Sequence, residues 1–256
     1  MTDILTVQQI SKSFGGLKAI IDLSFAVREG SITAIIGPNG AGKTTLFNLI
    51  SGLYRVDTGY ILFKGKRIEL LRPFLIPFHG IARTFQKLSV FPNMNVLENV
   101  MLGRYTLSSS GFFTCALNLR KYRDEEKDIR EKALFWLKFM NLEGIWNRKI
   151  REIPFEKQRL VEITRAIAAE PELILLDEPA AGLNITETRN LISSIYKIKE
   201  LGKTVLIVEH DMDLVMEISE TIVVLNFGEK IAEGPPREIQ GDERVISVYL
   251  GRESPK

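Results

Sequence analysis

The chain has 256 residues, 45% of them hydrophobic and 26% charged, an ordinary composition for a globular protein that can bury a substantial core. Its 34 basic and 32 acidic residues leave a formal net charge of +2, which argues against nucleic-acid binding and against an electrostatic membrane anchor. The only cysteine, Cys115, excludes an internal disulfide and a cysteine-cluster metal site, and it fits a reducing compartment. We expect neither a secretory signal nor a membrane-spanning helix, because no apolar run approaches about 18 residues.

The first third of the chain carries two kinds of strand signal. Residues 19–27 alternate apolar and polar side chains, which predicts a half-buried strand that ends at a turn over residues 29–30. Residues 32–36 form a short continuous apolar run before Gly37, which is typical of a buried parallel strand that feeds a loop. We therefore expect the sheet to start mixed, with a helix following over about 43–52.

The next segments suggest a small hairpin and then a helical insertion. Turn residues at 57–59 and 64–66 flank a short strand and predict an antiparallel hairpin before residue 70. Residues 95–159 read as helical, with a connection over 108–114 and a long charged helix over 121–140.

The remaining segments restore the parallel-sheet pattern. Apolar strands are predicted over 173–176, 204–208 and 221–225, with helices between them, and this alternation indicates an α/β core. We expect residues 1–86 and 161–256 to form the catalytic core and residues 87–160 a helical sub-domain.

A phosphate-binding loop is predicted between the first buried strand and its helix. The string GPNGAGKT fits G-x-x-x-x-G-K-[ST] at Gly37, Gly42, Lys43 and Thr44. The glycines let backbone N–H groups approach phosphate oxygens, Lys43 reaches the β and γ phosphates, and Thr44 is a ligand for Mg²⁺. The alternative is an ordinary turn before a core helix.

Two carboxylates follow a buried strand in the string LILLDEP. Asp177 can hold Mg²⁺ through water, and Glu178 can orient and deprotonate the water that attacks the γ-phosphate. Taken alone, the pair would more often cap a helix, but the phosphate loop favours catalysis.

Three further residues are candidates with open alternatives. His210 follows the next apolar strand and fits a γ-phosphate sensor, although a lone histidine is usually structural. Gln86 can contact Mg²⁺ or the attacking water by its amide, or it can be an ordinary surface residue. Phe14 can stack on adenine, or it can pack in the core.

Together these motifs resemble the ATPase subunit of an ABC transporter over residues 7–251. In chain order, Phe14 matches the adenine-stacking aromatic, GPNGAGKTT the Walker A loop, Gln86 the Q-loop, LILLDEP the Walker B strand, AAGLN the D-loop and His210 the switch histidine. The resemblance implies a P-loop NTPase (RecA-like) core with an N-terminal antiparallel β sub-domain and an inserted helical sub-domain.

The resemblance also implies the site residues and the cofactors, ATP and Mg²⁺. The residues expected to bind nucleotide are Phe14, Gly37, Pro38, Asn39, Gly40, Ala41, Gly42, Lys43, Thr44 and Thr45. Those expected to hold Mg²⁺ are Thr44, Gln86 and Asp177, and those expected to act in catalysis are Glu178, His210, Gln86 and Lys43.

Within the family, the strings ARTFQ, AAGLN, VEHDM and VISVYLG are most similar to ATPases of branched-chain amino acid importers, and lipopolysaccharide-export ATPases are a more distant likeness. This implies a second ATPase subunit and transmembrane permease subunits as partners, an indirect partnership with a substrate-binding protein, and no nucleic acid. The implied location is peripheral, on the cytoplasmic face of the cell membrane. In such dimers each ATP lies between the Walker A loop of one subunit and the signature motif of the other.

One motif departs from the family pattern. Residues 153–159, IPFEKQR, stand where the family has roughly Leu-Ser-Gly-Gly-Gln, so Glu156 replaces a glycine whose N–H faces the partner's γ-phosphate. Two like unit charges about 4 Å apart repel by about 4 kcal/mol at an effective dielectric constant near 20. Against this, an acidic residue near a helix N-terminus is stabilising, and its side chain can turn toward solvent. We expect an impaired signature, which favours a heterodimer with an intact partner over a homodimer.

Rival functions fit less well. An exporter subunit, or a regulatory subunit with little hydrolysis of its own because of Glu156, remains an alternative. An ABC-type protein acting on ribosomes or DNA would need a second ATPase half, a coiled coil or a basic surface. A GTPase would need an Asn-Lys-x-Asp motif, and a small-molecule kinase leaves AAGLN and His210 unexplained.

Overall fold

The computed structural model describes residues 2–107 and 120–250, so Cys115 and the expected connection over 108–114 lie outside the described residues. The chain folds into two compact units. The first unit comprises Met1–Ile76 and Leu173–Lys256, and the second unit comprises Pro77–Glu172. The second unit contains more residues, at both of its ends, than the helical sub-domain expected over 87–160. A boundary at 160 would cut α5 (Phe155–Ala168), which is one unbroken helix.

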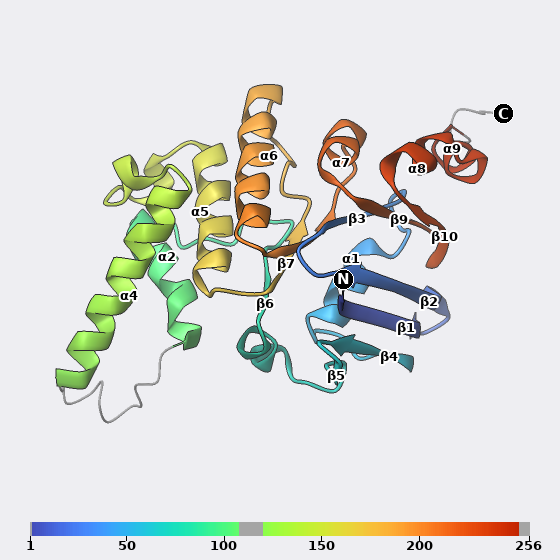
Figure 1. Cartoon of the computed structure of the whole chain (residues 1–256), viewed down its shortest axis with the longest axis horizontal. Helices are drawn as coiled ribbons and strands as arrows, with labels where there is room; N and C mark the ends of the chain where they lie inside the picture. Colours follow the sequence, from blue (N-terminus) through green and yellow to red (C-terminus); the bar gives the residue numbers. More distant parts are fainter. Residues whose placement is uncertain (1, 108–119, 251–256) are drawn as a thin grey trace. The chain divides into compact units, whose positions relative to one another are not determined.

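The first unit contains a sheet made only of antiparallel pairs (Figure 1). Its strands, in spatial order, are β2 (Leu17–Arg28), β1 (Asp3–Phe14), β4 (Thr58–Phe63) and β5 (Lys66–Arg67). The predicted hairpin before residue 70 is confirmed as β4 and β5. The expectation that residues 19–27 begin a mixed sheet is wrong, because β2 pairs with β1, a strand that the sequence pattern did not predict.

The parallel sheet is the framework of the first unit. Within that unit the spatial order is β10 (Glu229–Gly234), β9 (Thr221–Asn226), β3 (Ile32–Ile36), β8 (Thr204–Val208) and β7 (Leu173–Asp177). Strands β9, β3, β8 and β7 are mutually parallel as predicted, and β10 adds an antiparallel edge through a tight turn after β9. Every residue of β3, β7 and β8 is buried, which explains their continuous apolar sequences.

The helices of the first unit cover these sheets and connect their strands. They are α1 (Lys43–Ile50), η1 (Pro73–Leu75), α6 (Ile185–Glu200), α7 (Met212–Ile218), α8 (Pro236–Gly241) and α9 (Glu243–Leu250). Helix α1 contacts both β2 and β7, so it lies between the two sheets (Figure 1). Asn184 caps α6 and Asp211 caps α7, each accepting hydrogen bonds from backbone N–H groups of the first turn.

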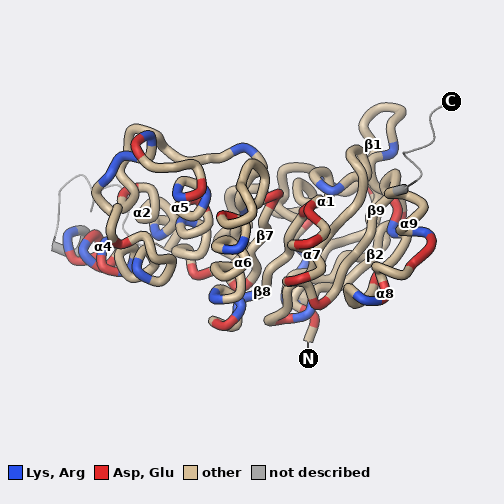
Figure 2. Tube along the Cα trace, turned by 90° about the horizontal axis from the view of Figure 1, so that it is seen from above, with Lys and Arg blue, Asp and Glu red and all other residues tan. Residues whose placement is uncertain are grey.

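The second unit is mainly helical. Its elements are η2 (Pro77–His79), β6 (Ile81–Arg83), α2 (Val96–Arg104), η3 (Tyr105–Leu107), α4 (Arg120–Phe139), η4 (Glu143–Ile145), η5 (Ile150–Glu152) and α5. Helix α2 packs against both α4 and α5. Acidic and basic residues alternate along α4 (Figure 2), where Lys127 pairs with Glu131 and Asp128 with Lys132 on the exposed surface. Within residues 2–107 and 120–250, no helix combines the length and apolar character needed to cross a membrane.

Candidate functional site

The register of the parallel sheet brings the predicted site residues of the first unit to one edge. Val208, the last residue of β8, pairs with Ile35 of β3 on one side and with Asp177 of β7 on the other. Because the three strands are parallel, the chain leaves all of them at the same edge. The phosphate loop after β3, Glu178 after β7 and His210 after β8 therefore meet there, as the sequence predicted.

Two glycines of the loop over residues 37–42 lie very close to backbone atoms of other segments. Gly37 has φ 152° and Gly42 has φ 105°, in the region that L side chains rarely adopt. A Cβ atom on Gly37 would lie 2.2 Å from the carbonyl oxygen of Leu225, and one on Gly42 would lie 2.6 Å from that of Ala19. Both positions therefore admit only glycine, and the loop is fixed from both sides.

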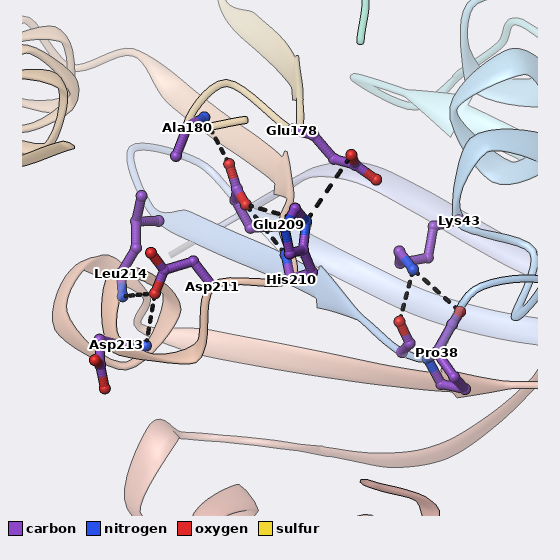
Figure 3. A network of polar contacts seen from close by, with 10 residues as sticks. Pro38, Lys43, Glu178, Ala180, Glu209, His210, Asp211, Asp213 and Leu214 are labelled. Carbon is purple, nitrogen blue, oxygen red and sulfur yellow. Dashed lines mark hydrogen bonds and ion pairs between the residues drawn. The ribbon is translucent and has the colours of Figure 1, made fainter. Parts of the chain in front are cut away.

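Lys43 is the first residue of α1, and its side chain reaches back to the start of this loop. Its side chain is buried, and its Nζ donates hydrogen bonds to the carbonyl oxygens of Gly37 at 2.6 Å and Pro38 at 3.1 Å (Figure 3). An ammonium group enclosed by a loop of backbone dipoles is suited to bind the phosphates of a nucleotide. The arrangement fits the predicted phosphate site.

The oxygen donors that the sequence assigns to Mg²⁺ in this unit are Thr44, in the first turn of α1, and Asp177, buried at the end of β7. In the part of the chain that the structure describes, no cluster of three or more His, Cys, Asp or Glu side chains could enclose a metal ion by itself. Mg²⁺ commonly takes only one or two protein oxygens, and water and phosphate oxygens complete its shell. The donor set fits that mode of binding.

Glu178 and His210 face each other across the ends of β7 and β8 (Figure 3). Oε2 of Glu178 lies 3.9 Å from Nδ1 of His210, and the His210 side chain is 62% exposed. The backbone N–H of Glu178 donates to the carbonyl oxygen of Val208 at 2.9 Å. A carboxylate and an imidazole are thus held beside each other at this edge of the sheet.

Glu209 is a site residue that sequence reasoning missed. Its side chain is fully buried and accepts hydrogen bonds from the backbone N–H groups of Ala180 at 2.8 Å and His210 at 3.1 Å. Burial raises the pKa of the Glu209 carboxyl above its usual range, and these hydrogen bonds oppose the rise. The string VEHDM contains Glu209, but no local pattern indicates that its partner is Ala180.

Phe14 lies at the end of β1 with 41% of its surface exposed. Tyr54, which the sequence did not single out, contacts it edge-on with ring centres 5.1 Å apart, and the Lys12 ammonium lies 5.5 Å from the ring centre. Asp57 accepts hydrogen bonds from Lys12 and from the backbone of Ser13, and the Lys12 bond is the main cause that lowers the pKa of Asp57. The Phe14 ring is therefore held in place while part of it stays accessible.

Gln86 belongs to the second unit, where its side chain is exposed. Arg159 of α5 donates hydrogen bonds to the carbonyl oxygens of Phe85 and Gln86, both at 3.1 Å. Arg159 also forms a buried ion pair with Glu162 at 2.8 Å, and Glu162 accepts from the N–H of Ser89 at 3.0 Å. The predicted contact of the Gln86 amide with Mg²⁺ or water stays a prediction.

Glu156 lies in the first turn of α5, and its side chain is only 12% exposed. Its Oε1 is 3.8 Å from Nζ of Lys157. The carboxylate therefore does not turn fully into solvent, and its position in the first turn matches the favourable interaction with the helix N-terminus.

Comparisons with known proteins agree with this geometry. A family described as "ABC transporter" matches residues 20–181, and one described as "Branched-chain amino acid ATP-binding cassette transporter" matches residues 229–254. The high-affinity branched-chain amino acid transport ATP-binding protein BraF of Pseudomonas aeruginosa is 39% identical, covering 97% of this chain and 98% of BraF. The probable branched-chain amino acid transport ATP-binding protein LivG of Archaeoglobus fulgidus is 37% identical, covering 97% and 95%.

Solved structures give the same result. A nucleotide-free ATP-binding cassette from an ABC transporter superposes with a TM-score of 0.84 at 34% identity, covering 97% of this chain and 99% of that one. A dimeric cassette bound to ADP and phosphate in a post-hydrolysis state gives 0.75 at 26% identity, covering 91% and 99%. These likenesses confirm the predicted fold class, a P-loop NTPase core with a separate antiparallel sheet.

Proposed function

Because the chain belongs to the ABC transporter family and is an ATPase of that family, we propose that it powers the uptake of branched-chain amino acids by a membrane transporter. The observation that carries the proposal is the meeting of the phosphate loop, Asp177, Glu178 and His210 at one edge of the parallel sheet. The names of these relatives support the substrate class. The match over residues 229–254 supports it independently of the ATPase motifs.

In the proposed mechanism, the loop backbone and Lys43 bind the β and γ phosphates, and Phe14 stacks on the adenine. Thr44 and Asp177 would hold Mg²⁺, with Gln86 as the proposed third protein donor, and the ion held there would supply neutralisation of charge on the phosphates. Glu178 orients the attacking water and takes its proton, and His210 donates a hydrogen bond to the γ-phosphate.

The proposed partners are a second ATPase subunit and transmembrane permease subunits, with a substrate-binding protein acting indirectly. A heterodimer is favoured because Glu156 would stand close to the γ-phosphate bound by a second copy of this chain. An ATP bound to this chain's Lys43 would then lie against an intact signature motif of a different subunit. The chain would act at the cytoplasmic face of the membrane.

A cavity in the second unit supports docking of a permease segment. The cavity has a volume of about 410 Å³ and is lined mainly by η2, β6, α2 and α5, with Phe91, Leu102 and Arg165 among its walls. A short amphipathic helix that places apolar side chains in such a groove is a recurring mode of recognition.

The test is reconstitution of the chain with a partner ATPase and permease in vesicles that enclose ATP, with the binding protein outside. We expect ATP-dependent uptake of labelled leucine that Lys43→Ala abolishes and that Lys66→Ala, a change at an exposed lysine of β5, leaves intact. ATP turnover without uptake of leucine, isoleucine or valine would refute the proposed substrate class.

A further inference from the structure

Glu209 is a buried carboxylate that the proposed hydrolysis does not use, although it lies beside two of its residues (Figure 3). We propose that Glu209 is a positioning residue for ATP hydrolysis, holding the backbone around Glu178 and the backbone of His210 in one fixed arrangement. The inference rests on the proposed roles of Glu178 and His210, and it adds a residue that contacts neither ATP nor water in that scheme.

The backbone of Glu178 is strained. Its φ is 47°, in the left-handed region that residues other than glycine rarely adopt. Glu178 also precedes Pro179, and a residue before proline favours an extended backbone. Such a conformation persists only where the surrounding structure holds it, and it is found most often at functional sites.

Two consecutive residues at the end of β8 hold this strained turn from both sides. Before the turn, the N–H of Glu178 donates to the carbonyl oxygen of Val208 at 2.9 Å. After the turn, the N–H of Ala180 donates to Oε1 of Glu209 at 2.8 Å. These two hydrogen bonds fix the direction in which the Glu178 side chain leaves the sheet. The backbone of Val208 accepts one of them, and the Glu209 side chain accepts the other.

The second carboxylate oxygen of Glu209 contacts His210. Oε2 accepts from the backbone N–H of His210 at 3.1 Å and lies 3.9 Å from its Nδ1. One carboxylate thus bonds the chain segments that carry both Glu178 and His210. Displacement of a reacting group by about 1 Å costs about 100-fold in rate, so loss of this link is expected to slow hydrolysis.

The chemistry of the position requires a carboxylate. Burial of a charged group is unfavourable unless hydrogen bonds compensate it, and here backbone donors from two segments supply them. Glutamine offers one carbonyl oxygen and one amide NH₂, so it can accept from Ala180 or from His210 but places a donor against the other N–H.

The experiment compares Glu209→Gln with Glu69→Gln. Glu69 is also buried in the first unit and accepts a hydrogen bond from a backbone N–H, that of Ile61 in β4. It pairs with Arg67 of β5 and not with a residue of the candidate site. The maximal turnover rate, the dissociation constant for ATP and the urea midpoint are measured for each full-length variant mixed with the partner ATPase. We expect Glu209→Gln to lower maximal turnover by about tenfold to 100-fold with ATP affinity unchanged within about twofold.

A double variant separates positioning from general stabilisation. If Glu209 acts through Glu178, then Glu209→Gln has little further effect on the residual turnover of Glu178→Gln. Glu209→Asp, which keeps the charge but shortens the reach, is expected to lower turnover too, and it keeps the inference testable if the glutamine variant does not fold. Normal turnover of Glu209→Gln, or a loss matched by Glu69→Gln, would overturn the inference. Normal turnover of Glu178→Gln would instead refute the proposed role of Glu178 itself.

Discussion

Oε2 of Glu178 and Nδ1 of His210 lie 3.9 Å apart at the ends of the adjacent parallel strands β7 and β8. The separation is too long for a direct hydrogen bond, so each side chain can bond a third group. In the proposed mechanism these groups are the attacking water for Glu178 and the γ-phosphate for His210.

This relationship predicts that Glu178→Gln abolishes most turnover without preventing ATP binding. Glutamine keeps the size of the side chain but cannot take a proton, and loss of a general base typically costs about 10² to 10⁴ in rate. Single-turnover hydrolysis and equilibrium ATP binding measure the two effects separately. Glu217→Gln, at an exposed position on α7, is the control, and a rate of Glu178→Gln within threefold of that control would contradict the assignment.

The residues at this edge of the sheet could be predicted from the sequence. Each has a side chain suited to the site, and each follows a local pattern typical of a buried strand. Lys43 follows a buried strand and a glycine loop, and Asp177 and His210 stand at the ends of two other apolar strands. Parallel strands end at a common edge, so three local patterns were enough to predict a site formed by distant segments. That part of the prediction needed no knowledge of the packing.

Strand β1 and the contacts of Glu209 could not be predicted from the sequence. The strand contains a break in periodicity, and the contacts of Glu209 join distant segments. Strand β1 went unpredicted because its register shifts between Val7 and Ile10, and Gln9 has φ 46° there, so the alternation of side chains changes phase. The acceptor role of Glu209 requires the N–H of Ala180, which lies 29 positions away in the sequence. No periodicity within either segment carries that information.

Glu156→Gly is predicted to raise the ATP turnover of the chain measured alone. The expected reason is removal of a negative charge that would repel the γ-phosphate by about 4 kcal/mol at about 4 Å. Glu152→Gly removes the same charge from an exposed position just before α5 and is expected to change turnover little. Strong turnover of the unmodified chain alone, lost on Lys43→Ala, would show that Glu156 does not impair the signature.

Phe14→Ala is predicted to weaken ATP binding. Loss of an aromatic stacking contact worth about 0.5 to 1.5 kcal/mol raises the dissociation constant between about twofold and tenfold. Titration with a fluorescent ATP analogue measures the change. Tyr60→Ala removes an aromatic ring of similar exposure from β4, and equal weakening by the two substitutions would argue against a specific role for Phe14.

Arg159→Met is predicted to destabilise the second unit. The substitution leaves Glu162 charged, buried and without its ion-pair partner Arg159, and it removes the hydrogen bonds to Phe85 and Gln86. Removal of one member of a buried pair costs about 3 to 5 kcal/mol in unfolding free energy. Urea unfolding measures the loss, and Lys132→Met, which breaks an exposed pair on α4, is expected to cost less than about 1 kcal/mol. Equal losses for the two variants would contradict the importance of burial.

Gly103→Ala is predicted to disturb the packing of α2 against α5. A Cβ atom on Gly103 would lie 2.0 Å from the carbonyl oxygen of Arg165, which is backbone of α5 and cannot rotate away as a side chain can. The two helices must separate, and overpacking of this kind typically costs about 1 to 3 kcal/mol. Gly144→Ala is the matched control, because its new methyl group meets no atom within 4 Å and its φ is not positive. Urea midpoints compare the stabilities of the two variants.

The same substitution is expected to lower ATP turnover in the mixture with the partner ATPase, because α5 begins at the segment that carries Glu156 and would be displaced. A Gly103→Ala variant as stable and as active as Gly144→Ala would contradict the close contact between α2 and α5.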